Sequence, residues 1–184
     1  MNKPSFNKNS NRMKKLRFLG AAFLALGMIA CTTNPMTGRS SIQLVKNSEI
    51  NAMALKEYSG TLSKSKVIKN TAAAKSIVDV GTRIKNAANN YYKSIGREGD
   101  IADYQWEFAL IDDKQLNAWC MPGGKVAVYT GILPITKDNT GLAVVMGHEV
   151  SHALAGHGNE RISQAMIAQY GGAILGGAIS NSQW

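Results

Sequence analysis

The strongest constraint on this chain is a pair of histidines four residues apart at the end of an apolar stretch. The segment His148–His152 reads HEVSH and follows Leu142–Met146, in which every residue is apolar. This pattern predicts a helix with one buried side, because residues four apart lie on the same helix face. The two imidazoles then differ by about 40° around the axis and about 6 Å along it. They can therefore share one metal ion.

A glutamate directly after the first histidine favours a catalytic zinc site. Zinc lowers the pKa of a bound water towards neutrality, and Glu149 stands where it can take a proton from that water. The same carboxyl can then protonate a departing amine. The alternative is a pair of helix histidines without a metal. All three histidines of the chain fall within residues 148–157, and this concentration favours the metal interpretation.

A catalytic zinc ion normally has three protein ligands, and the third is not evident. On a continuous helix, His157 points about 140° away from His152. We therefore interpret His157 as a residue that supports the ligands rather than binds the metal. Glu160 is the only acidic residue after Glu149, and it lies about 12 Å along such a helix from His152. It is a poor candidate for the missing ligand.

Residues 1–30 are predicted to be a lipoprotein signal peptide. Basic residues at 14–17 precede Phe18–Ala30, an apolar stretch shorter than the roughly 20 residues needed to span a bilayer. The small residue before Cys31 resembles a lipobox, so Cys31 is the predicted lipidation site. An ordinary cleaved signal peptide and an uncleaved apolar helix remain alternatives. A translation start at Met13 also stays open.

The charge distribution argues against nucleic-acid binding. The formal net charge is +9, but six basic residues and no acidic ones precede Cys31, which leaves 15 basic and 12 acidic residues in the remainder. The remainder has no basic run of the kind that binds nucleic acid. Lipidation of Cys31 would leave Cys120 as the single thiol, which we interpret as a small buried hydrophobe. A disulfide between these two cysteines is the alternative.

Hydrophobic periodicity predicts helices and strands in alternation. One helix stripe repeats apolar residues at steps of three and four, and one strand alternates aromatic with polar residues. Residues 31–47 are rich in turn formers and are predicted to be a tether. The segment 165–180 is predicted to be a buried helix or a glycine-loosened connector. The predicted elements are helices Ser48–Leu62, Thr71–Ile95 (stripe Ile77, Val80, Ile84, Ala88, Tyr91, Ile95) and Asn139–Gly158, and strands Tyr104–Ile111 and Lys125–Tyr129.

Three further motifs accompany the histidine helix and carry a family resemblance. They are Asn117–Lys125 (NAWCMPGGK), Tyr129–Leu133 (YTGIL) and His157–Ser163 (HGNERIS). Together with HEVSH they resemble the gluzincin family of HtpX, the Oma-type mitochondrial protease and the CAAX prenyl endopeptidase, known as the M48 metallopeptidases. The resemblance extends to that family's bacterial periplasmic lipoproteins. It implies an α+β, zincin-like fold with a small sheet and an active-site helix.

The resemblance also implies roles for individual residues. His148 and His152 match the first two ligands of one zinc ion, and Glu149 matches the catalytic glutamate. The strand after Pro122 matches the strand beside the substrate cleft, where an edge accepts an extended peptide by strand addition. Its candidate substrate-binding residues are Gly123, Gly124 and Val126, although a plain sheet strand is the alternative. The family's third ligand is a glutamate on a later helix, so residues 48–184 are predicted to be a C-terminally incomplete domain.

The sequence thus predicts a zinc-dependent endopeptidase that hydrolyses unfolded or damaged envelope proteins. We expect polypeptide substrates, no nucleic acid, and a membrane anchor through lipidated Cys31; the oligomeric state stays open. The predicted location is the bacterial cell envelope, facing the periplasm, with the outer membrane favoured over the inner. The alternative function is an incomplete domain or pseudoenzyme that binds peptides or a partner without hydrolysis.

Overall fold

The computed structural model describes residues 31–180, and side chains within 32–170. The predicted signal peptide, 1–30, lies outside the described residues. The chain divides into two units at Leu44, which are described separately. In the first unit, β1 (Cys31–Thr33) and β2 (Ser40–Ile42) form an antiparallel hairpin in the segment predicted as a tether. The Asn34 side chain shapes its turn by accepting hydrogen bonds from the backbone N–H groups of Met36 and Thr37.

The second unit is built on a mixed four-stranded sheet in the order β3-β4-β6-β5. Strands β4 and β6 are parallel, while β3 pairs with β4 and β5 pairs with β6 in antiparallel fashion. Strand β6 is therefore an inner strand, and β3 and β5 lie at the two edges. The strands span Val67–Ile68 (β3), Glu107–Ile111 (β4), Ala118–Met121 (β5) and Lys125–Tyr129 (β6).

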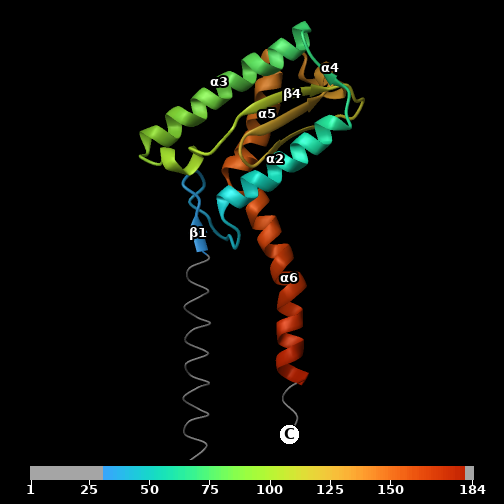
Figure 1. Cartoon of the computed structure of the whole chain (residues 1–184). Coiled ribbons are helices and arrows are strands. Elements are labelled where there is room, and N and C mark those ends of the chain that lie inside the picture. The colour runs from blue at the N-terminus through green and yellow to red at the C-terminus, as the bar shows by residue number, and fades with distance from the viewer. Residues whose placement is uncertain (1–30, 181–184) are drawn as a thin grey trace, which may run out of the picture. The chain divides into compact units, whose positions relative to one another are not determined.

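Helices cover both faces of this sheet (Figure 1). Val126 and Val128 of β6 pack into the larger core with α3 and α5, whereas Ala127 packs with Tyr58 of α2 on the other face. This alternation is the period of two that a strand imposes on its side chains. The helices span Asn47–Ser63 (α2), Ala72–Ser94 (α3), Leu133–Thr136 (α4), Asn139–Leu154 (α5) and His157–Ser180 (α6), with short 3-10 turns at Glu98–Ile101 and Thr130–Ile132.

The first two predicted helices form, but the start and cap of α2 and the buried residues of α3 differ from prediction. Helix α2 begins one residue earlier than predicted, after Lys46, and Ser48 does not cap it. Thr71 does cap α3, because its side chain accepts a hydrogen bond from the backbone N–H of Ala74. Tyr91 is 40% exposed, and Tyr92 takes its place in the core. The buried stripe moves by one residue because 3.6 residues per turn drifts over so long a helix.

The strands differ more from prediction. Strand β4 begins at Glu107 rather than Tyr104, yet the preceding aromatic rings are still in contact, with the Tyr104 and Trp106 centroids 5.5 Å apart and their planes tilted by 51°. Strand β6 has the predicted bounds. Strands β3 and β5 were not predicted, because two to four residues are too few to show a reliable alternation.

Helix α6 is attached to the unit by its first turns. Asn159 is buried and donates hydrogen bonds to the Val45 carbonyl and the Asn47 side chain. Ser163 is also buried, but residues 164–170 are exposed, so the prediction of a buried helix is wrong for the part of 165–180 whose side chains are described. Among the described residues, no helix has the length and apolar character required to cross a membrane.

Two glycine-to-alanine substitutions test the packing around α5. A Cβ at Gly141 would lie 2.1 Å from the Thr136 carbonyl oxygen, whereas a Cβ at Gly60 of α2 meets nothing within 4 Å. We expect Gly141→Ala to lower the free energy of unfolding by about 1–3 kcal/mol. Gly60→Ala should raise it by about 0.5–1 kcal/mol, because alanine loses less conformational entropy in a helix. Urea unfolding measures both, and equal effects would contradict the packing described.

Candidate metal and peptidase site

The histidine pair stands on the exposed side of a helix whose other side is fully packed. Asp138 caps the start of α5, its carboxylate accepting hydrogen bonds from the backbone N–H groups of Thr140 and Gly141 at 2.8 and 2.9 Å. The side facing the core then repeats at helical spacing. It consists of Leu142, Met146, Val150, Ala153 and Leu154. This burial leaves the face that carries His148 open to solvent.

The two imidazoles approach each other at the separation that a shared metal requires. The Nε2 atoms of His148 and His152 are 3.1 Å apart, and the ring centroids are 4.5 Å apart. Two nitrogens bound at about 2.0–2.1 Å to one tetrahedral zinc ion lie roughly 3.3 Å from each other. The pair therefore fits two ligand positions of one zinc ion with little adjustment.

His157 turns back towards this pair, because the helix is interrupted before it. The predicted continuous helix to Gly158 is wrong: α5 ends at Leu154, and Gly156 has a φ of 73°. Glycine adopts this left-handed conformation without the steric cost that a Cβ imposes. The Nδ1 atom of His157 then lies 2.8 Å from Nδ1 of His152. His157 does not point 140° away.

The contact between the two Nδ1 atoms defines a consistent arrangement of protons. If Nε2 of His152 binds a metal, its proton resides on Nδ1, which donates to Nδ1 of His157. The end of α5 is also fixed from the core side, where the Tyr92 hydroxyl donates to the Leu154 carbonyl at 3.4 Å. That bond satisfies one of the carbonyls left without a partner at a helix end.

Among the described residues, no third metal-binding side chain joins His148 and His152. Within residues 31–180, no group of three His, Cys, Asp or Glu side chains is close enough together to hold a metal ion. Glu160 lies in the first turn of α6, and its Oε1 accepts a hydrogen bond from Gln164 at 3.3 Å. The described residues therefore bring together His148 and His152, and His157 contacts His152 through its Nδ1 atom.

Strand β5 runs beside α5 and places Cys120 near Glu149. Burial raises the pKa of the Cys120 thiol to about 12, and the negative charge of Glu149 adds to this shift. Burial is the larger cause, since a thiolate is poorly solvated in an apolar surrounding. Cys120 is packed against the core, as the sequence suggested, and its thiol does not have the lowered pKa of a nucleophile.

The three predicted substrate-binding residues lie in different surroundings. Val126 is fully buried in β6, which is paired on both sides and offers no free edge for strand addition. The prediction that this strand is an edge is therefore wrong, and the edge next to α5 belongs to β5. Gly123 and Gly124 form the turn between β5 and β6, with φ of 79° and 80°. The signal that could have identified β5 is the NAWCM part of the family-like motif, which contains it.

The turn between β5 and β6 contacts the helix that carries His157. A Cβ placed on Gly158 would lie 3.0 Å from Cγ of Pro122. On the other side of the turn, a Cβ on Gly124 would lie 2.7 Å from the indole of Trp106. The end of β5 is thus held between α6 and the aromatic stack.

A comparison with known families identifies the class of this domain. The profile of the peptidase family M48 matches residues 82–183. The chain therefore belongs to peptidase family M48. The matched region contains the second half of α3, the sheet strands β4 to β6, and the histidine helix.

Named relatives support this membership. The mitochondrial metalloendopeptidase OMA1 of Schizosaccharomyces pombe is 46% identical over 34% of the chain and 19% of the relative. Metalloendopeptidase OMA1, mitochondrial, of Bos taurus is 26% identical over 95% of the chain and 34% of the relative. Metalloprotease YcaL of Escherichia coli is 27% identical over 56% of the chain and 42% of the relative. The chain thus spans less than half the length of each of these relatives.

The same comparisons correct the predicted location. A lipid-anchored protein of the bacterial envelope was expected, but the fungal, plant and animal relatives are named as mitochondrial, and the bacterial matches are weaker. A basic leader without acidic residues is common to several targeting classes. The charge pattern of the first 30 residues therefore did not determine a compartment, and the envelope location is withdrawn.

The raised pKa of Cys120 predicts an unreactive thiol. In a Cys31→Ser variant, Cys120 is the single cysteine. At pH 8 the folded protein should contain on the order of one thiolate in ten thousand molecules, whereas an unfolded thiol of pKa near 8.5 is about one quarter ionised. We expect Ellman's reagent to react at least 100-fold more slowly with the native than with the urea-unfolded protein. Similar rates in the two states would contradict the burial of Cys120.

Proposed function

We propose that this chain carries the catalytic core of a zinc-dependent endopeptidase that hydrolyses peptide bonds in unfolded or damaged polypeptides. His148 and His152 are its zinc ligands, and Glu149 is its general base. The observation that carries this proposal is the 3.1 Å separation of the two Nε2 atoms on one exposed helix face. Membership of peptidase family M48 supports the same chemistry.

Each residue of the site has a separate role in the proposed hydrolysis. Zinc held by the two imidazoles would polarise a water molecule and lower its pKa. Glu149 adjoins His148 and is half-buried, so its carboxylate can take a proton from the attacking water and transfer it to the departing amine. His157 accepts the hydrogen bond from Nδ1 of His152 and thereby orients that ligand.

The free edge of β5 supports a polypeptide substrate in extended conformation. It lies last in the described sheet and packs beside α5, the helix that carries Glu149. Strand addition uses backbone hydrogen bonds, which every sequence can make. Folded proteins rarely present a free extended segment, so this mode of binding favours unfolded or damaged substrates.

Substitution of the general base tests the proposed chemistry. The zinc-loaded protein should cleave casein, and Glu149→Gln should reduce the rate by about 10²–10⁴-fold while leaving zinc bound. Glu57→Gln, an exposed position on α2, is the matched control and should have no effect. A chelator should abolish cleavage and added zinc should restore it. Zinc binding without cleavage by the unsubstituted protein would overturn the proposal.

Substitution of His157 tests its orienting role separately from catalysis. His157→Asn retains an acceptor near the position of Nδ1, whereas His157→Leu removes it. We expect His157→Leu to weaken zinc binding by about 10–100-fold and His157→Asn to weaken it much less. Competition with a chromophoric chelator measures both affinities. Equal affinities for the two variants would show that His157 does not act through its hydrogen bond.

A second candidate function rests on the absence of a gathered third ligand among residues 31–180. In this alternative the chain binds extended polypeptides at β5 and does not hydrolyse them. Two imidazoles alone should bind zinc far more weakly than the nanomolar strength of a complete site. Nanomolar zinc affinity of the chain, with casein cleavage, supports the peptidase. Weak zinc affinity with intact peptide binding supports the second candidate.

A further inference from the structure

A groove opens at the edge of the sheet that lies opposite to β5. It has a volume of about 560 Å³ and is lined by residues of α2, α3, β3 and β4. None of the three histidines belongs to its lining, and the chemistry proposed above does not use it. The groove is therefore a separate feature of the fold, and its backbone, its apolar walls and its charges can be considered in turn.

Strand β3 covers only part of the edge of β4. The two residues of β3 pair with Leu110 and Ile111, whereas β4 begins at Glu107. The chain then leaves the sheet at Asn70, whose φ of 61° lies outside the range of a strand, and enters α3. Residues 107–109 of β4 therefore have no strand partner on this side among the described residues.

The backbone of Phe108 is directed at this gap. The N–H of Glu107 donates to the carbonyl of Gly124, which precedes β6. Backbone groups of successive residues point to opposite edges of a strand, so the N–H and C=O of Phe108 point to the β3 side. Asp112 agrees with this alternation, because its N–H donates to the Lys66 carbonyl before β3. Within the part of the chain that the structure describes, neither backbone group of Phe108 has a hydrogen-bond partner there.

Both hydrophobic cores reach the surface in this groove. Helices α2 and α3 cover opposite faces of the sheet (Figure 1), and residues of both line the groove. Leu62 packs against the core on the α2 side, while Ala74 and Phe108 pack against the core on the α3 side. Val78 of α3 also lines the groove and is 46% exposed. A strand added here would place alternate side chains on the two sides and extend both cores.

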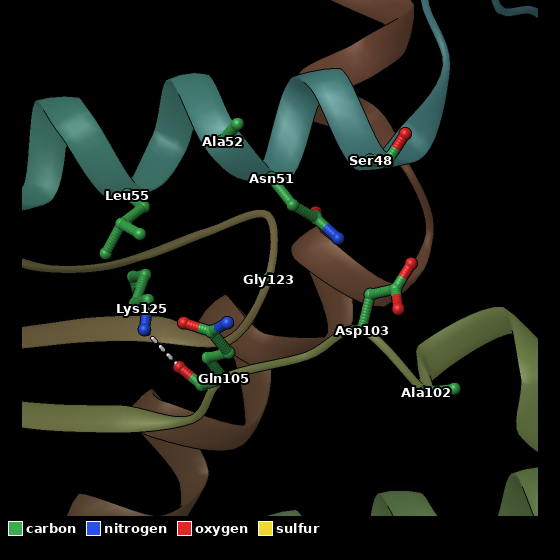
Figure 2. Close-up of a pocket in the computed structure, with 9 residues that line it drawn as sticks. All are labelled: Ser48, Asn51, Ala52, Leu55, Ala102, Asp103, Gln105, Gly123 and Lys125. Atoms are coloured by element: carbon green, nitrogen blue, oxygen red, sulfur yellow. Dashed lines mark hydrogen bonds between the residues drawn. The ribbon is translucent and has the colours of Figure 1, made fainter.

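The charged groups of the lining leave a net positive charge. Glu107 is neutralised by Lys125, whose ammonium donates to Oε1 of Glu107 at 2.6 Å and to the Gln105 carbonyl (Figure 2). Two lysines and one aspartate remain, which gives a net charge of +1, and none of them has an ion pair within the described residues. These three residues are Lys69, Lys75 and Asp79.

The chain that leads into the groove is also basic. Residues 58–78 contain four lysines and no acidic residue. One of them, Lys66, forms an exposed ion pair with Asp112 at 2.6 Å. Charge complementarity therefore favours an acidic occupant. The first 30 residues of this chain do not meet that requirement, because they contain six basic residues and no acidic one.

We propose that this groove binds an extended, acidic segment of a partner polypeptide, which adds as a strand to β4 beyond the end of β3. Its backbone pairs with the N–H and C=O of Phe108, its apolar side chains pack between α2 and α3, and its carboxylates lie near Lys69 and Lys75. A single extended chain suits the groove, since the helices on both sides of the edge would obstruct a second folded sheet. The assignment does not rest on the proposed peptidase activity.

Peptide binding to the Glu149→Gln protein, which should not hydrolyse its ligand, tests the charge requirement. A fluorescent peptide of about seven residues has a Val-Thr-Val centre flanked by aspartate and glutamate, and its twin has asparagine and glutamine instead. At low ionic strength the acidic peptide should bind about fivefold more tightly than the twin. Lys69→Gln with Lys75→Gln should remove that preference and leave binding of the twin unchanged. Lys56→Gln with Lys93→Gln, at exposed positions of α2 and α3 outside the groove, is the matched control and should keep it.

Hydrogen exchange of backbone amides tests the strand addition. In the free protein the N–H of Phe108 should exchange faster than that of Glu107, which is bonded to the Gly124 carbonyl. Saturating acidic peptide should slow exchange at Phe108 at least tenfold and leave exchange at Glu107 unchanged. Both amides belong to the same strand, so a general change in stability would affect them together.

The possible outcomes decide the proposal. Equal affinity for the two peptides, or a preference that the substitutions at Lys69 and Lys75 leave intact, overturns it. Protection that appears on β5 and not at Phe108 also overturns it, because the peptide then lies on the edge proposed for the substrate. Vesicles with anionic lipid are tested in parallel. Binding to them through Lys69 and Lys75, without binding of the acidic peptide, would assign these lysines to a membrane surface instead.

Discussion

The interruption between α5 and α6 is the constraint on which the histidine site depends. Gly156 adopts a left-handed conformation that ends α5 and starts α6 at a new angle, so that His157 meets His152 at 2.8 Å. Without this turn, His157 would lie on another side of one long helix. The other end of α5 is fixed by the Asp138 cap, and its buried side is fixed by the core. The chain therefore presents His148 and His152 on a packed helix, with the imidazole of His157 in contact with that of His152.

The sheet supports α5 by packing against its buried side, and it places an unpaired strand edge beside it. Its inner strand β6 is buried between helix layers, with Val126 and Val128 on the side of α5 and Ala127 on the side of α2. Its edge strand β5 remains unpaired on one side within the described residues, next to the helix that carries Glu149. The buried strand β6 is therefore the direct neighbour of β5, whose outer edge is unpaired among the described residues. The turn between them contacts α6 through Pro122 and lines a polar cavity through Gly123 (Figure 2).

The sequence predicted those features that local periodicity and short motifs encode. The helix through His148, the strand Lys125–Tyr129 and the position of α3 follow from side-chain patterns within single elements. The place of β6 inside the sheet did not follow, because strand order depends on contacts between segments far apart in the chain. The orientation of His157 was missed for a similar reason. Both Gly156 and Gly158 can end a helix, and the glycine that does so is selected by tertiary packing.

The central claim is that Nε2 of His148 and Nε2 of His152 bind one zinc ion while His157 remains outside the metal. The chain has three histidines, so proton–nitrogen correlation spectra of its imidazoles can be assigned by single substitutions. On titration with zinc, we expect the Nε2 resonances of His148 and His152 to shift together, with the proton of His152 on Nδ1. Both ring nitrogens of His157 should keep the signature of an imidazole without metal. A metal-bound nitrogen on His157, or a shift confined to one histidine of the pair, would contradict the account.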